Sequence, residues 1–309
     1  MRDKVNRTEA VVADPDAAIE IKNLTYVYNP RTPFEKKALD DVSLTVRRGD
    51  FFGVIGQTGS GKSTLISHMN ALTRVQKKRG MNADATVRVC GIDLTVKKPD
   101  LGLLRGKVGM VFQYPEYQLF ADTVADDVAF GPKNLGLSAE ETDERVRAAI
   151  RLVGLDYSEI ADRSPFELSG GQKRRAAIAG VLAMRPELLI LDEPTAGLDP
   201  EGKRELLALF RDVQRTTCPT IVMVSHNMDE VAECCNKVAV LGEGHILGVF
   251  APEQLFSERE LIRSLGLELP AAVELSYYLS EHGVSVRPDC LTERELIDAL
   301  AEVYGGDGK

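Results

Sequence analysis

Residues 56–63, which read GQTGSGKS, have the types and spacing needed to hold a phosphate. They fit the phosphate-loop pattern GxxxxGK followed by Ser or Thr, in which glycines let backbone N–H groups point at phosphate oxygens. The helix expected directly after the loop would favour an anion at its N-terminus. We expect Lys62 to reach the β- and γ-phosphates of a nucleotide and the Ser63 hydroxyl to bind Mg²⁺.

Two acids, Asp192 and Glu193, follow an apolar run at residues 188–191 that is typical of a buried strand. Ligands of parallel sheets gather at the carboxyl ends of the strands. We therefore expect Asp192 to hold Mg²⁺ through water and Glu193 to polarise the attacking water as a general base. An acidic pair alone more often begins a helix or loop, but the phosphate loop in the same chain favours the catalytic interpretation.

The elements that must position these residues are also visible in the sequence. Residues 19–27 and 42–46 alternate as strands do, and Phe51–Ile55 is a short apolar run that ends at the phosphate loop. Apolar spacing predicts a helix over residues 62–72. Further helices are expected at 141–153, with Ser138 at its start, at 172–184 and at 228–235, and further strands at 220–224, 238–241 and 245–250. This alternation predicts a mostly parallel sheet covered on both faces.

The composition excludes several classes of protein. The chain has 309 residues, 44% of them hydrophobic, and a formal net charge of −9, which disfavours nucleic-acid binding. No apolar run approaches the roughly 18–20 residues that span a bilayer. The five cysteines have no metal-binding spacing and suit a reducing, intracellular compartment.

Residues 168–172 read LSGGQ and stand before a helix rich in Lys and Arg. Ser169 and the paired glycines make another donor-rich helix start suited to an anion, although a chain with one phosphate loop needs no second one for the same nucleotide. The run resembles the signature motif of ATP-binding-cassette (ABC) ATPases. In that family the motif binds the γ-phosphate held by the opposite subunit.

Other segments resemble ABC motifs in the same order along the chain. Gln113 resembles the Q-loop glutamine, which senses Mg²⁺ and the attacking water, and residues 196–199 (AGLD) resemble the D-loop, which crosses the dimer interface. His226 resembles the switch histidine. Tyr28 stands where the family places an aromatic that stacks on adenine, and Tyr26 is a competing choice, expected on the opposite face of the strand. A lone histidine or tyrosine is more often structural, so the shared order favours the functional interpretation.

The resemblance covers about residues 19–250 and implies an α/β P-loop NTPase. Such a fold has a RecA-like core, an antiparallel β-subdomain and a helical subdomain that carries the signature. We divide the chain into a flexible N-terminal tail (1–17), an ABC ATPase domain (18–250) with a helical insertion at about 114–185, and a small, mainly helical C-terminal dimerisation extension (251–309). The resemblance also implies ATP and Mg²⁺ as ligands. It implies a head-to-tail dimer that ATP closes and hydrolysis opens.

The resemblance assigns a role to each matching residue. The implied catalytic residues are Glu193, His226 and Gln113, and the implied metal site comprises Ser63, Gln113 and Asp192. The implied nucleotide-binding residues are Tyr28, Gly56, Gln57, Thr58, Gly59, Ser60, Gly61, Lys62, Ser63, Thr64, Ser169, Gly170, Gly171, Gln172 and Asp199.

Residues 112–120 (FQYPEYQLF), 128–134 (VAFGPKN) and 32–35 (TPFE) resemble the ATPase subunits of energy-coupling-factor (ECF) transporters, which import vitamins and transition-metal ions. The phosphate loop together with residues 172–175 (QKRR) resembles the second of two ATPase types, although that type more often has His at position 57. Such systems pair two ATPases with a membrane coupling protein and a substrate-binding membrane protein. We expect a peripheral protein at the cytoplasmic face of the membrane, as a heterodimer in preference to a homodimer.

Residues 114–130 follow the Q-loop, where the ECF family docks a helix of its membrane partner. We expect the aromatic side chains of this segment to take an apolar helix face and its acids to pair with arginine: Tyr114, Tyr117 and Phe120, and Glu116, Asp126 and Asp127. The alternative is a packed, solvated connector.

Three other functions share part of this pattern. A non-transport ABC ATPase acting on nucleic acid or the ribosome usually carries a coiled-coil insertion, zinc cysteines or two cassettes, and the sequence has none of these. Intact Lys62, Asp192, Glu193 and His226 disfavour an inactive cassette. A monomeric small-molecule kinase has no use for LSGGQ. We therefore expect an ATPase that powers an ECF importer and binds no nucleic acid.

Overall fold

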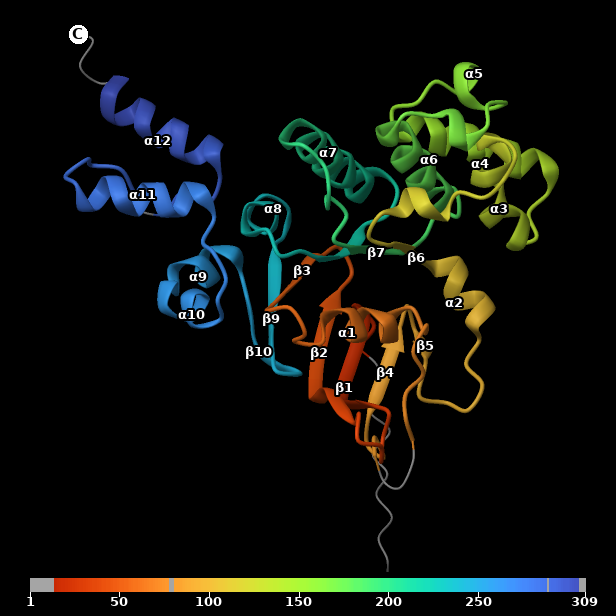
Figure 1. Cartoon of the computed structure of the whole chain (residues 1–309), viewed down its shortest axis with the longest axis horizontal. Helices are drawn as coiled ribbons and strands as arrows, with labels where there is room; N and C mark the ends of the chain where they lie inside the picture. Colours follow the sequence, from red (N-terminus) through yellow and green to blue (C-terminus); the bar gives the residue numbers. More distant parts are fainter. Residues whose placement is uncertain (1–13, 78–80, 288, 306–309) are drawn as a thin grey trace, which may run out of the picture.

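The computed structural model describes residues 14–77, 81–287 and 289–305, which form two sheets with helices around them (Figure 1). Residues 1–13 of the predicted tail and residues 288 and 306–309 of the predicted extension lie outside the described part. The larger sheet has the strand order β10-β9-β3-β8-β7-β6, and only the β10–β9 pair is antiparallel. Its strands are β3 (Phe51–Ile55), β6 (Val108–Val111), β7 (Leu188–Asp192), β8 (Thr220–Val224), β9 (Lys237–Gly242) and β10 (His245–Phe250).

The smaller sheet is antiparallel throughout and has the order β2-β1-β4-β5. Its strands are β1 (Ala17–Tyr28), β2 (Lys36–Arg47), β4 (Thr86–Val89) and β5 (Ile92–Asp93). The sequence predicted β1 and β2 but not the short strands β4 and β5, whose pattern is too brief to distinguish from a loop. Together the two sheets confirm the predicted α/β class with an antiparallel subdomain.

Strands β3, β7 and β8 of the larger sheet are buried on both faces, as their continuous apolar runs predicted, whereas the edge strand β10 is partly exposed. Alternate residues of the strands β3, β7, β8 and β9 enter different hydrophobic clusters, so that Phe51 belongs to one and Phe52 to the other. The first cluster includes Ile178 of α6 (Gly170–Leu182) and Phe210 of α7 (Pro200–Thr216). The second includes Leu65 of α1 (Lys62–Met69) and the core of the smaller sheet. The helices α6 and α1 therefore cover opposite faces.

The remaining helices of the main body are α2 (Leu101–Lys107), α3 (Val124–Asn134), α4 (Ala139–Leu152), α5 (Tyr157–Ile160) and α8 (Met228–Cys234). Ser138 begins α4 with a capping box to Glu141, as the sequence predicted. Several predicted helix ends were wrong by one to three residues, including both ends of α4, which runs from residue 139 to 152 instead of 141 to 153. The first helix ends at Met69 instead of residue 72, α6 begins at Gly170 because Ser169 caps it, and α8 ends one residue early at Cys234.

Helices α3–α6 lie on one side of the molecule and the C-terminal helices on the other (Figure 1). The C-terminal helices are α9 (Pro252–Ser257), α10 (Arg259–Ser264), α11 (Ala271–Glu281) and α12 (Glu293–Gly305). Leu255 and Ile262 join α9 and α10 to the main core, whereas α11 and α12 enclose a small core of their own around Cys290. The exact domain boundaries stay a prediction. None of the helices in the described ranges is long and apolar enough to cross a bilayer.

Candidate nucleotide site

The candidate residues follow the carboxyl ends of four neighbouring parallel strands. The phosphate loop follows β3, Gln113 follows β6, Glu193 follows β7 and His226 follows β8. Because parallel strands bring these ends to one edge of the sheet, residues distant in sequence meet there.

Two glycines give the phosphate loop a shape that other residues do not allow. Gly61 caps α1 with φ +108°, and a Cβ there would collide with the carbonyl oxygen of Ala38. Gly56 has φ +149°, and its Cβ would collide with the carbonyl oxygen of Leu241. Both obstacles are backbone atoms of adjoining strands, so they cannot move aside as a flexible side chain would. The loop is thus wedged between β2 and β9.

The Lys62 ammonium is buried inside this loop. Its Nζ donates to the carbonyl oxygens of Gly56 at 2.8 Å and Gln57 at 2.9 Å. Burial lowers the pKa of Lys62, and the charges of Glu193 and Asp192 oppose that shift. Burial and the charge of Glu193 raise the pKa of Asp192, and Lys62 opposes that shift. Partly desolvated charges of both signs beside one loop are typical of a site for a charged ligand.

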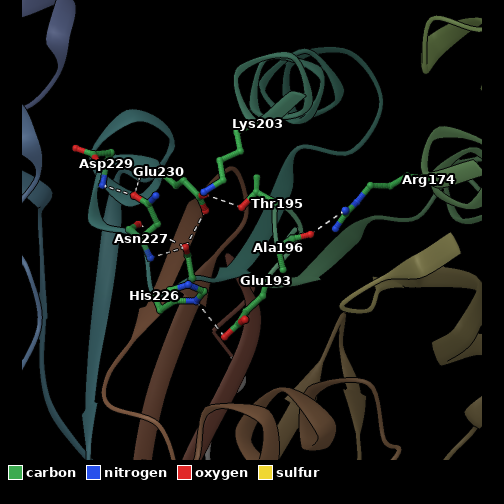
Figure 2. Close-up of polar contacts among 10 residues, drawn as sticks. Arg174, Glu193, Thr195, Ala196, Lys203, His226, Asn227, Asp229 and Glu230 are labelled. Carbon is green, nitrogen blue, oxygen red and sulfur yellow. Dashed lines mark hydrogen bonds and ion pairs between the residues drawn. The ribbon is translucent and has the colours of Figure 1, made fainter. Parts of the chain in front are cut away.

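Glu193 lies at the centre of the candidate catalytic group. Its carboxylate accepts a hydrogen bond from Gln113 Nε2 at 3.2 Å and lies 3.4 Å from His226 Nδ1, the latter contact drawn in Figure 2. The backbone has φ +47°, a strained value for glutamate, and its N–H donates to the carbonyl of Val224 at the end of β8. The structure therefore brings together the three predicted catalytic residues.

The side chains near the phosphate loop suit a Mg²⁺ ion that binds together with a nucleotide. Within the described ranges no group of three or more His, Cys, Asp or Glu side chains could hold a metal ion. Mg²⁺ in nucleotide sites keeps several waters, binds phosphate oxygens and needs only one or two protein ligands. Ser63 is exposed in the first turn of α1, and Asp192 ends β7 close enough to Lys62 to influence its pKa. These two residues fit the predicted role.

Tyr28 presents its ring beside the start of α1. Its hydroxyl lies 3.1 Å from Thr64 Oγ1, and 40% of the residue is exposed. The expectation that Tyr26 points to the opposite face is wrong, because residues two apart on a strand share a face. The two rings meet edge to face with centroids 4.9 Å apart, and Tyr26 also packs against His68. Tyr28 is thus the more accessible of the two rings.

The LSGGQ residues stand at the start of α6, a helix that lies apart from α1 and the phosphate loop before it (Figure 1). Ser169 Oγ accepts from the N–H of Gln172 at 3.3 Å, and the Gln172 side chain accepts from the N–H of Ser169 at 3.1 Å. Gly170 and Gly171 are exposed, and a Cβ at either would have no other atom within 4 Å. Packing within this chain therefore does not require glycine there. Asp199, also exposed, caps α7 through the N–H of Gly202.

Two charged residues of the site, Arg174 and Glu230, received no role of their own from the sequence. Arg174 is buried, donates to the carbonyl of Ala196 at 2.9 Å and lies 4.0 Å from Glu116. Burial lowers the pKa of Arg174, and Glu116 opposes that shift. Glu230 is buried under the loops that carry Glu193 and His226. A basic helix start was the only sequence signal for Arg174, and Glu230 had none.

The fold and this site define a P-loop ATPase of the ABC type. The family model described as "ABC transporter" matches residues 39–196. Two curated relatives are named energy-coupling factor transporter ATP-binding protein EcfA2. That of Symbiobacterium thermophilum is 51% identical over 288 residues, and that of Clostridium tetani is 47% identical over 287 residues. Each match covers 93% of this chain and 97% of the relative.

Solved structures agree with these relatives. The structure of cbiO1 from Clostridium perfringens, described as part of the ABC transporter complex cbiONQ, has a TM-score of 0.69 at 34% identity, over 86% of this chain and 99% of that one. The ATP-binding cassette MJ0796, solved as a dimer bound to ADP and Pi, has a TM-score of 0.65 at 25% identity, over 76% and 98%. The chain therefore belongs to the energy-coupling factor transporter ATP-binding proteins of the ABC family. The predicted family and ATPase activity are confirmed.

Proposed function

We propose that this chain hydrolyses ATP with Glu193 as general base and thereby powers an ECF importer of a vitamin or transition-metal ion. The observation that carries the proposal is the placement of the Glu193 carboxylate between Gln113 and His226, at the same sheet edge as the phosphate loop. Glu193 accepts a proton from water as the water oxygen attacks the γ-phosphorus, and the bond to the ADP oxygen breaks. Lys62 and the loop hold the phosphates, and Mg²⁺, when bound with ATP, offsets their charge.

Glu193→Gln tests this assignment. The amide keeps the size of the side chain but cannot take a proton, so we expect unchanged ATP affinity and hydrolysis slower by about 10²–10⁴-fold. The matched control is Glu187→Gln, just before β7, where the carboxylate contacts Lys107 and Arg48 instead of the site. Rapid turnover by Glu193→Gln would show that another group is the base.

We further propose that Ser169, Gly170, Gly171, Gln172 and Asp199 serve a nucleotide on a second ATPase subunit. Support comes from the exposure of Ser169, Gly170, Gly171 and Asp199 and from the open space at the two glycines. In addition, α6 and α1 cover opposite faces of the larger sheet, so the signature does not adjoin its own phosphate loop. The dimer of the related cassette MJ0796 is in keeping with this arrangement. The EcfA2 relatives favour a heterodimer over a homodimer.

A groove next to the Q-loop is our proposed docking site for an apolar helix of a membrane coupling protein. The groove has a volume of about 530 Å³ and lies between α2, α3 and α6. Phe120 and Phe130 line it, with 60% and 50% exposure, and their rings meet edge to face at 5.0 Å. Such exposed aromatic pairs suit a helix-in-groove contact. A substrate-binding membrane protein would complete the complex at the cytoplasmic face of the membrane.

The acids of this segment already have partners within the chain. Glu116 faces Arg174, Asp126 contacts Lys133 at 3.0 Å, and Asp127 accepts from the N–H groups of residues 120 and 121. The predicted pairing of these acids with arginine of the partner would have to displace these contacts. The apolar groove therefore carries the docking proposal.

Replacing both groove aromatics with alanine tests the docking proposal. Because both rings are exposed, we expect Phe120→Ala with Phe130→Ala to keep ATP binding and thermal stability but to lose co-purification with the membrane proteins. Phe34→Ala, which removes a still more exposed ring outside the groove, is the control. Intact assembly and uptake in the double variant would refute the docking site.

A further inference from the structure

Glu230 of α8 is buried, with only 3% exposure, and its carboxylate accepts two short hydrogen bonds. Oε1 accepts from the hydroxyl of Thr195 at 2.6 Å, and Oε2 accepts from the hydroxyl of Ser225 at 2.8 Å. Lys203 of α7 adds a cation 3.9 Å from Oε1 (Figure 2). Glutamate is rarely buried unless it is paired, so these contacts account for its position.

The two hydroxyls belong to the two loops that carry the candidate catalytic residues. Thr195 lies two residues after Glu193, in the same turn. The N–H of Ala196 closes this turn by donating to the carbonyl of Glu193. Ser225 directly precedes His226. The Glu230 carboxylate therefore joins the loop after β7 to the loop after β8. The same two loops carry Glu193 and His226, which lie 3.4 Å apart.

We propose that Glu230 is a positioning residue that holds the Glu193 and His226 loops at the separation that hydrolysis requires. The inference rests on the proposed roles of those two residues. Hydroxyl-to-carboxylate hydrogen bonds of this length are among the stronger ones in proteins. The strained backbone of Glu193, with φ +47°, persists only where surrounding contacts hold it, and the Thr195–Glu230 bond is such a contact.

The start of α8 does not depend on this carboxylate. Asn227 caps the helix, because its Oδ1 accepts from the N–H groups of Asp229 at 2.9 Å and Glu230 at 3.3 Å. Met228 and Val231 bury the helix against the core. A change at the Glu230 side chain can therefore alter the loops while the helix remains folded, which separates a positioning role from a general structural one.

The test compares Glu230→Ala and Glu230→Gln in the purified full-length assembly. Glu230→Ala removes both hydrogen bonds, and a misplacement of about 1 Å lowers catalysis by about 10²-fold, so we expect kcat to fall by about ten- to a hundredfold. ATP affinity, which the phosphate loop supplies, should change less than twofold. Glu230→Gln keeps the shape and can still bond to both hydroxyls, so it should restore most of kcat. Glu233→Gln, on the same helix and paired with Arg211, is the control.

A second substitution tests whether the loss of kcat in Glu230→Ala arises from the broken hydrogen bond between Thr195 and Glu230. Thr195→Val should lower kcat in the otherwise unchanged chain but should add little to Glu230→Ala, because its partner is already gone. Near-normal kcat in Glu230→Ala, with Glu193→Gln inactive, would overturn the positioning role and leave the proposed function intact. A parallel loss of kcat, ATP affinity and folded protein would reduce Glu230 to a structural residue. Rapid turnover by Glu193→Gln would overturn both proposals.

Discussion

Alanine substitutions at Gly61 and Gly171 separate two reasons for a glycine. We expect Gly61 to be required for the fold of this chain, and Gly171 to be required for a nucleotide held by a second subunit. Gly61 has φ +108°, and a Cβ there meets the backbone oxygen of Ala38. A residue held in such a conformation costs about 1–3 kcal/mol, and forced contact costs a further 1–3 kcal/mol or so. We expect Gly61→Ala to lower the free energy of unfolding by about 2–6 kcal/mol, a large part of the ~5–15 kcal/mol of a typical domain.

Gly171 should behave in the opposite way. It lies in the first turn of α6, and its Cβ would meet no atom within 4 Å. Since alanine favours helix over glycine by up to about 1 kcal/mol, the stability of Gly171→Ala should stay the same or rise slightly. If the open space receives the nucleotide of a second subunit, the added methyl group enters that site. We expect hydrolysis to fall at least about tenfold, which corresponds to ~1.4 kcal/mol.

Two measurements decide between these outcomes. Denaturant unfolding of the nucleotide-free chain reports stability, and steady-state hydrolysis by the purified assembly at saturating ATP reports the shared site. ATP binding to the variant's own phosphate loop serves as the control and should not change in Gly171→Ala. Normal hydrolysis by Gly171→Ala, or a loss of stability as large as that of Gly61→Ala, would refute the reasoning.

Three further predictions use the same assays. Ser169→Ala and Ser138→Ala each remove the serine of a capping box and should each cost about 1 kcal/mol of stability, but only Ser169→Ala should slow hydrolysis; equal activities would exclude a role for Ser169 beyond capping. Tyr28→Ala should weaken ATP binding by roughly five- to a hundredfold in a fluorescent-nucleotide titration if stacking is worth about 1–3 kcal/mol, whereas Tyr28→Phe should bind normally. Burial raises the pKa of Asp192, so its ionisation destabilises the nucleotide-free fold as the pH rises through that pKa. Asp192→Asn should therefore unfold at a higher temperature than the unchanged chain at pH 7, with the difference vanishing toward about pH 4.

Much of the fold was predictable because its signals are local. The strands β3, β7 and β8 are buried on both faces, so each appears as a short continuous apolar run. Ser138 and Glu141 stand at capping-box spacing and begin α4 where expected. Helix ends were less accurate, because caps and tertiary contacts set them. The strands β4 and β5 are too short to produce a pattern at all.

The amino-acid sequence by itself established the phosphate loop, the acidic strand end and the signature, since each is a run of adjacent residues with its own chemistry. It did not establish which distant side chains meet. The contacts of Gln113 and His226 with Glu193 arise because neighbouring parallel strands end at one edge of the sheet. The pairing of Glu116 with Arg174 and the bridge made by Glu230 likewise depend on packing between elements far apart in the chain. No sequence spacing encodes such contacts, because the three-dimensional path between the elements sets their distances.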